Sequence, residues 1–94
     1  MQREDVFKAL SDPTRREILR MLRKQPMPAG ELSEAFAITK GSLSHHFNIL
    51  KSADLVRCER RGQFQVYSLN TSVFEETLAM LLDLFGPDKK RKRS

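Results

Sequence analysis

The most chemically informative stretch of the chain is residues 40–53, where polar and apolar side chains separate onto two faces of a predicted helix. At about 100° per residue, Leu43, Phe47 and Leu50 fall together, and we expect them to face a core. The opposite face is small and polar and carries no acid, whereas an ordinary solvated helix face, the alternative, is usually rich in Glu and Lys. Because a helix that reads DNA needs close approach together with donors and acceptors, we predict DNA contacts from Lys40, Gly41, Ser42, Ser44, His45 and Asn48.

A second basic cluster lies between two runs that alternate apolar with polar residues, residues 55–59 and 63–69. Such alternation is typical of strands, and Gly62 can take a positive φ, so we predict a β-hairpin with its turn at residues 60–62. The side chains near its tip suit phosphate or minor-groove contacts, which we predict for Arg57, Arg60, Arg61 and Gln63. A solvated turn is the alternative, and Glu59 is a candidate partner for one of the arginines.

Other reactive side chains do not form a recognisable site. His45 and His46 are adjacent, and neighbouring helical residues diverge by about 100°, so we predict that they do not chelate one metal ion. We expect His46 to flank the core and to hold the helix by hydrogen bonding. Cys58 is the single cysteine, and in a predicted strand we expect its thiol to be buried and inert. Because no phosphate loop, nucleophile motif or carboxylate pair appears, we predict neither an enzyme nor a cofactor.

The elements that position these residues are mainly helices. A short first helix carries Val6, Phe7 and Leu10, and residues 11–13 end it and start the next. Further helices are predicted at about residues 13–24, 29–36, 40–53 and 71–85. A connection of about three residues between the third and fourth is helix-turn-helix spacing. The order α-α-α-α-β-β-α, with a basic hairpin, predicts a mainly α winged helix.

The second predicted helix begins with bases where acids would suit the helix dipole. Arg15 and Arg16 follow Pro13 directly. We expect the arginines of this helix to point mostly outward, and at least one of Arg15 and Arg16 to form a salt bridge or contact a phosphate.

Charge and composition limit what the chain does. It has 94 residues and a formal net charge of +5, so we predict one domain, residues 1–87, and a basic disordered tail, residues 88–94. Residues 40–67 carry five bases and two acids, a net +3 that favours phosphate. The tail either adds non-specific DNA affinity or only aids solubility. One cysteine and no apolar run of about 20 residues predict a cytoplasmic protein without membrane insertion.

Several motifs in order resemble the ArsR family of repressors. The residues FKALSDPTRREIL (7–19) resemble the family's opening, and SLSHHFNIL (42–50) resembles the signature of its recognition helix. The wing motifs are RGQF (61–64) and YSLN (67–70), and they are most similar to the SdpR-like autorepressor subgroup. The resemblance covers roughly residues 5–82.

The resemblance implies a homodimeric, sequence-specific repressor of transcription that binds double-stranded DNA at an inverted-repeat operator. Each recognition helix would enter a major groove, with half-sites about 10 base pairs apart. In the family the first and last helices form the dimer interface, which here implies Val6, Phe7, Leu10, Phe74, Leu78, Leu81 and Leu82.

One departure from the family concerns metal sensing. Metal-sensing members carry a pair of thiolates on the third helix, where this chain reads ELSEAF (31–36) without cysteine, and the last helix has no histidine. We therefore predict a repressor without the usual metal sites, which a regulatory protein partner could control. The alternatives are a repressor that senses a metal or small effector at a non-standard site, and a winged helix that binds proteins instead of DNA.

Overall fold

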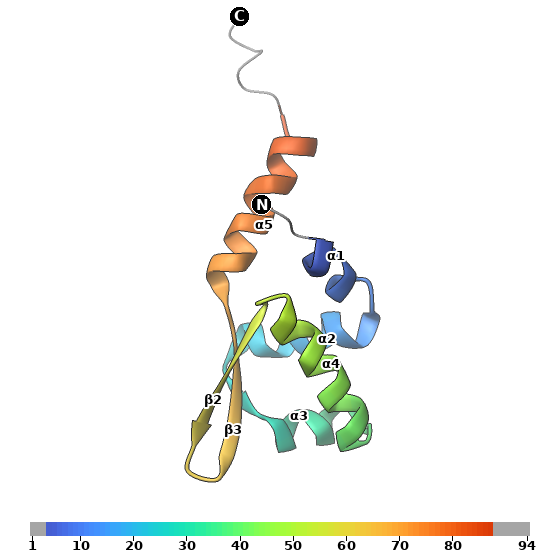
Figure 1. Ribbon diagram of the computed structural model, residues 1–94, viewed down its shortest axis with the longest axis vertical. Coiled ribbons are helices and arrows are strands. Elements are labelled where there is room, and N and C mark those ends of the chain that lie inside the picture. Colours follow the sequence, from blue (N-terminus) through green and yellow to red (C-terminus); the bar gives the residue numbers. More distant parts are fainter. Residues whose placement is uncertain (1–3, 88–94) are drawn as a thin grey trace, which may run out of the picture.

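The computed structural model describes residues 4–87 as helices packed against a small antiparallel sheet (Figure 1). In chain order the elements are α1 (Glu4–Leu10), α2 (Pro13–Lys24), β1 (Met27–Pro28), α3 (Ala29–Phe36), α4 (Lys40–Ser52), β2 (Val56–Arg61), β3 (Phe64–Leu69) and α5 (Thr71–Phe85). The predicted helices lie where the sequence placed them, and the winged helix-turn-helix fold is confirmed. The predicted basic tail lies outside the described residues.

Polar side chains cap the N-termini of α2 and α4. The Asp12 carboxylate accepts a hydrogen bond from the backbone N–H of Arg15 at 3.0 Å, and Pro13 occupies the first position of α2. Thr39 Oγ1 accepts from the backbone N–H of Ser42 at 3.1 Å at the start of α4. Between α3 and α4, Ala37 takes the left-handed conformation with φ of 52°, so three residues complete the helix-turn-helix.

The sheet contains one strand more than the sequence predicted. β1 pairs with β3, which also pairs with β2, so the order is β1-β3-β2 and all neighbours are antiparallel. Met27 and Pro28 were left between two predicted helices, at about residues 13–24 and 29–36, without a strand. Two residues are too few to show strand alternation, and a proline is compatible with a strand only at the edge of a sheet, which is where β1 lies.

The hairpin turn also differs from its prediction. β2 continues through Arg60 and Arg61, so the loop consists of Gly62 and Gln63. Gly62 has a φ of +61°, as its predicted role required. The predicted end of the first strand, at residue 59, was wrong. Two consecutive arginines suggest a loop in the sequence, but β2 is an edge strand, where Arg60 and Arg61 pair with β3 without being buried.

The core fixes α4 against the hairpin. Leu43, Phe47 and Leu50 are buried as predicted. The ring of Phe47 stacks on that of Tyr67 in β3, with centroids 3.8 Å apart and planes inclined by 5°. Burial of Tyr67, and then the neighbouring Cys58, raises the pKa of the phenol to about 12, so the ring stays neutral in this contact at physiological pH.

Asn70 joins three elements at the base of the hairpin. Its backbone N–H donates to the carbonyl of Leu55 at 2.9 Å, and its Nδ2 donates to the carbonyl of Asp54 at 2.9 Å. Asp54 follows α4 with a positive φ of 60°, and Arg57 of β2 donates to Asn70 Oδ1 at 3.4 Å. Because α5 begins at the next residue, Asn70 links the segment after α4, β2 and the start of α5, the last of these through the backbone alone.

The molecule has two distinct ends. Figure 1 shows α1 and α5 at one end, and α3, α4 and the hairpin tip toward the other. Val73 and Thr77 are the buried residues of α5, and the second half of that helix exposes Leu78, Leu82, Leu84 and Phe85. Within residues 4–87, none of the helices is long and apolar enough to cross a membrane.

Candidate DNA-binding surface

The polar face of α4 is open to solvent along its whole length. The predicted contact residues of this helix are all exposed, namely Lys40, Gly41, Ser42, Ser44, His45 and Asn48. A Cβ built on Gly41 would meet no atom of the chain within 4 Å, so the glycine is not required by internal packing. The helix therefore presents a polar, acid-free surface that a groove can approach.

The predicted wing residues are all exposed, with Gln63 in the loop and the three arginines divided between the two faces of β2. Side chains alternate along a strand, so Arg57 and Arg61 share one face and Arg60 lies on the other with Cys58. Tyr67 is the register partner of Cys58 and stacks on α4, so the face that carries Arg60 is the one turned toward α4. The structure therefore places the wing arginines on two different faces, although the sequence predicted them as one cluster.

Local partners occupy several of the wing arginines. Arg61 pairs with Glu59 at 3.1 Å, with both side chains more than half exposed, which is the pairing anticipated for Glu59. Arg60 Nε donates to the Gly62 carbonyl at 3.2 Å. Exposed pairs of this kind contribute little to stability, so they leave the guanidinium groups available to a phosphate. Arg57 differs because it lies at the base of the hairpin, bonded to Asn70.

A groove of about 220 Å³ connects the recognition helix with the hairpin. Lys40 and Ser44 of α4 line it together with Gln65 of β3. Gln65 was absent from the predicted contacts. The strand register could have identified it, because Gln65 pairs with Arg60 and side chains paired across strands share a face.

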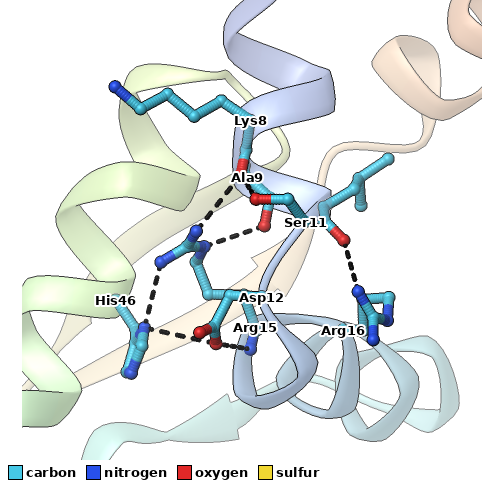
Figure 2. Close-up of polar contacts among 8 residues, drawn as sticks. Lys8, Ala9, Ser11, Asp12, Arg15, Arg16 and His46 are labelled. Carbon is cyan, nitrogen blue, oxygen red and sulfur yellow. Dashed lines mark hydrogen bonds and ion pairs between the residues drawn. The ribbon is translucent and has the colours of Figure 1, made fainter.

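Arg15 was predicted to point outward, and that prediction is wrong. Its side chain is only 8% exposed and lies between α1, α2 and α4 (Figure 2). The carbonyl oxygens of Lys8 and Ala9 accept hydrogen bonds from it, and His46 Nδ1 lies 3.3 Å from its Nη1. His46 is half-buried and hydrogen-bonded, as predicted. The sequence could not show the burial because the acceptors are backbone groups of another helix.

Cys58 was predicted to be buried and is exposed. Only Val56 of β2 reaches the core, so the strand beyond it extends into solvent and the thiol lies 3.6 Å from Gln65 Oε1. Among the described residues, no three His, Cys, Asp or Glu side chains lie together as metal ligands would. The rings of His45 and His46 have centroids 5.7 Å apart and planes inclined by 57°.

The residues predicted for dimerisation lie at the end of the molecule formed by α1 and α5. Phe7, Leu78 and Leu82 are exposed, and Leu10, Phe74 and Leu81 are half-buried. Val6 is fully buried in the core of the single chain and has no surface to offer a partner. A groove of about 540 Å³ adjoins these residues, with Leu10, Leu19, Leu69 and Phe74 as its apolar lining and Arg16, Arg20 and Arg23 among its polar lining.

Comparison with known proteins agrees with this arrangement. A family described as a helix-turn-helix domain matches residues 10–59, which run from the end of α1 into β2. Transcriptional repressor SdpR of Bacillus subtilis (strain 168) is 51% identical over 82 residues, covering 87% of this chain and 91% of that protein. The crystal structure of an ArsR family transcriptional regulator superposes with a TM-score of 0.81 at 26% identity, covering 96% of this chain and 94% of that one. The chain belongs to the ArsR family of winged helix-turn-helix repressors.

A second solved structure supports the same family. An ArsR-like transcriptional regulator from Rhodococcus sp. RHA1 has a TM-score of 0.77 at 30% identity, covering 94% of this chain and 82% of that one. The likeness to SdpR extends over the helices and the wing, so this ArsR-family chain is a DNA-binding transcriptional regulator of the SdpR-like kind.

Proposed function

We propose that the protein represses transcription in the cytoplasm by binding an inverted-repeat operator as a homodimer, with α4 in the major groove and the wing on the flanking backbone. The exposed, acid-free polar face of α4 carries this proposal, because its predicted contact residues all face solvent while its apolar face is buried. In this arrangement His45 and Asn48 contact base edges, and Lys40 contacts a phosphate. The protein acts by binding, without a metal ion or cofactor.

The surface of α1 and α5 supports the homodimer. Leu78 and Leu82 lie on one side of α5, exposed and next to the apolar groove that includes Leu10 and Phe74. An exposed apolar surface of this extent in a small protein usually marks an interface. A second copy placed there holds two α4 helices at a fixed separation, which an operator with half-sites about 10 base pairs apart requires. A regulatory protein that bound this surface would compete with the second copy.

Fluorescence anisotropy with the DNA upstream of the protein's own gene tests the proposal. At equal salt, the protein should bind this DNA at least about 1,000-fold more tightly than random DNA of the same length. His45→Ala should reduce the difference, whereas Asp83→Asn, an exposed change on α5, should not. Binding no tighter than to random DNA would refute the autorepressor form of the proposal, and footprinting on genomic DNA would then locate any other operator.

A further inference from the structure

The guanidinium group of Arg15 touches two helices besides its own (Figure 2). Its Nε donates to the carbonyl of Ala9 at 2.8 Å and its Nη2 to that of Lys8 at 3.2 Å, both in the last turn of α1. Its Nη1 lies 3.3 Å from Nδ1 of His46 on α4. Because the side chain is almost fully buried, water cannot readily replace a partner that is lost.

The contact defines which groups of the His46 ring act as donor and acceptor. A guanidinium offers only donors, so in this contact Nδ1 of His46 is the acceptor, which requires the tautomer with the ring proton on Nε2. The Asp12 carboxylate also faces the ring, but its Oδ2 is 3.8 Å from Nδ1, beyond hydrogen-bonding distance. Arg15 is therefore the bonded partner that orients this ring.

His46 lies between the two functional faces of α4. His45 precedes it and points to solvent on the DNA-reading face, and Phe47 follows it and stacks on Tyr67. A helix turns as one body, so the stack on one side and the Arg15 contact on the other together oppose rotation of α4 about its axis. A rotation of 10–20° is about the tolerance of a binding site.

We propose that Arg15 is a positioning residue for DNA binding. Through Nδ1 of His46 it holds α4 in the rotation that presents the polar face to the groove, and it connects that rotation to the end of α1. This inference rests on the proposed function. A rotated helix still meets the DNA backbone but no longer aligns with base edges, so losing the contact reduces sequence discrimination and leaves phosphate binding unchanged.

Arg15 and Lys24 are compared in the test, because both are basic residues of α2. Lys24 is exposed at the end of that helix and lies outside the contact with His46 and outside the groove beside the dimer residues. Arg15→Gln should lower the ratio of operator to random-DNA affinity by about tenfold, the size of a lost base contact, with an unchanged salt dependence. Lys24→Gln should change the ratio by less than about twofold.

Two substitutions of His46 separate positioning from folding. His46→Asn places an amide oxygen close to the position of Nδ1 and should retain most of the discrimination. His46→Leu keeps the bulk without the acceptor and should lose it. Thermal melting of each variant verifies that the protein is folded at the assay temperature. Equal discrimination by His46→Leu and the wild type, or a parallel loss of specific and random binding, would overturn the proposal.

An experiment without DNA keeps this inference separate from the proposed function. Backbone amide NMR spectra of His46→Leu should differ from the wild type throughout residues 42–49, because the helix turns as a body. Changes confined to the residues beside the ring would contradict the positioning role. If the wild type failed to discriminate any DNA, the proposed function would fail, and these spectra would still decide how α4 is held.

Discussion

Gly41 occupies a position where almost any other residue would favour the helix more. Glycine in a helix costs roughly 0.5–1 kcal/mol relative to alanine. A Cβ at this position would meet nothing in the chain, so the cost has no compensation within the protein. On the proposed function, the compensation is the close approach of DNA to the start of α4.

We therefore predict that Gly41→Ala raises stability while it lowers operator affinity. Urea denaturation should show a gain of roughly 0.5–1 kcal/mol, and anisotropy should show about a tenfold weaker complex. Gly30→Ala is the matched control, because Gly30 is also the second residue of a helix and also faces open space. It should gain the same stability and bind as the wild type. Unchanged binding by Gly41→Ala would show that the groove does not need the glycine.

Because Asp12 caps α2 as an ionised carboxylate, the stability of the protein depends on pH in the acid range. Its hydrogen bond from the Arg15 backbone N–H holds the pKa of the carboxyl below its ordinary value of 3.8, although burial opposes this. The carboxylate's contribution is therefore complete above pH 3.8 and is lost as the pH falls through the lowered folded-state pKa.

Two substitutions of Asp12 separate the contribution of its helix cap from the contribution of its charge. At neutral pH, Asp12→Ala should cost about 1 kcal/mol of unfolding free energy, the usual value of a helix cap. Asp12→Asn keeps an acceptor without a charge, so its unfolding free energy should approach that of the wild type as the pH drops below 3.8. A constant difference between these two proteins from pH 7 to pH 3 would argue against the ionic contribution.

At the level of elements, the wing should act through Arg60 more than through Arg57. Arg60 lies near the tip on the face turned toward α4, whereas Arg57 lies at the base and is bonded to Asn70. If Arg60 neutralises one phosphate, Arg60→Gln should reduce the slope of log affinity against log salt by about 1, equally for operator and random DNA. Arg57→Gln should leave the slope unchanged. Identical slopes for both variants and the wild type would place the wing away from the DNA.

The helices could be predicted from the sequence because their signals are local. Residues 11–13 mark the predicted start of α2, and in the structure the side chain of Asp12 caps that helix, as Thr39 caps α4. The apolar face of α4 followed from its period alone. β1 could not be predicted in this way, because its two residues become a strand only by pairing with β3.

The part of the candidate site on α4 could be predicted because it also depends on a local pattern. The exposed face of α4 follows from helical geometry, so its residues could be named. The division of the wing arginines required the strand register, and the burial of Arg15 required two backbone carbonyls from another helix. Contacts between distant elements leave no local pattern, and this is why Gln65 was missed.

At the scale of the whole molecule, dimerisation should control DNA binding. Leu82→Glu places a charge on the exposed apolar side of α5, so sedimentation should show a monomer and operator affinity should fall at least about 100-fold. Leu84 is equally exposed but lies about 160° from Leu82 around the helix, so Leu84→Glu is the control and should remain dimeric. A Leu82→Glu dimer with normal affinity would show that α5 is not the interface.

Asn70 couples the position of α5 to the end of α4. Its Nδ2 donates to the carbonyl of Asp54, two residues past α4, and α5 begins at the residue after Asn70. We therefore expect a change in the tilt of α5 to shift the residues that follow α4. In the proposed dimer, a partner bound along α5 would then change the angle between the two recognition helices.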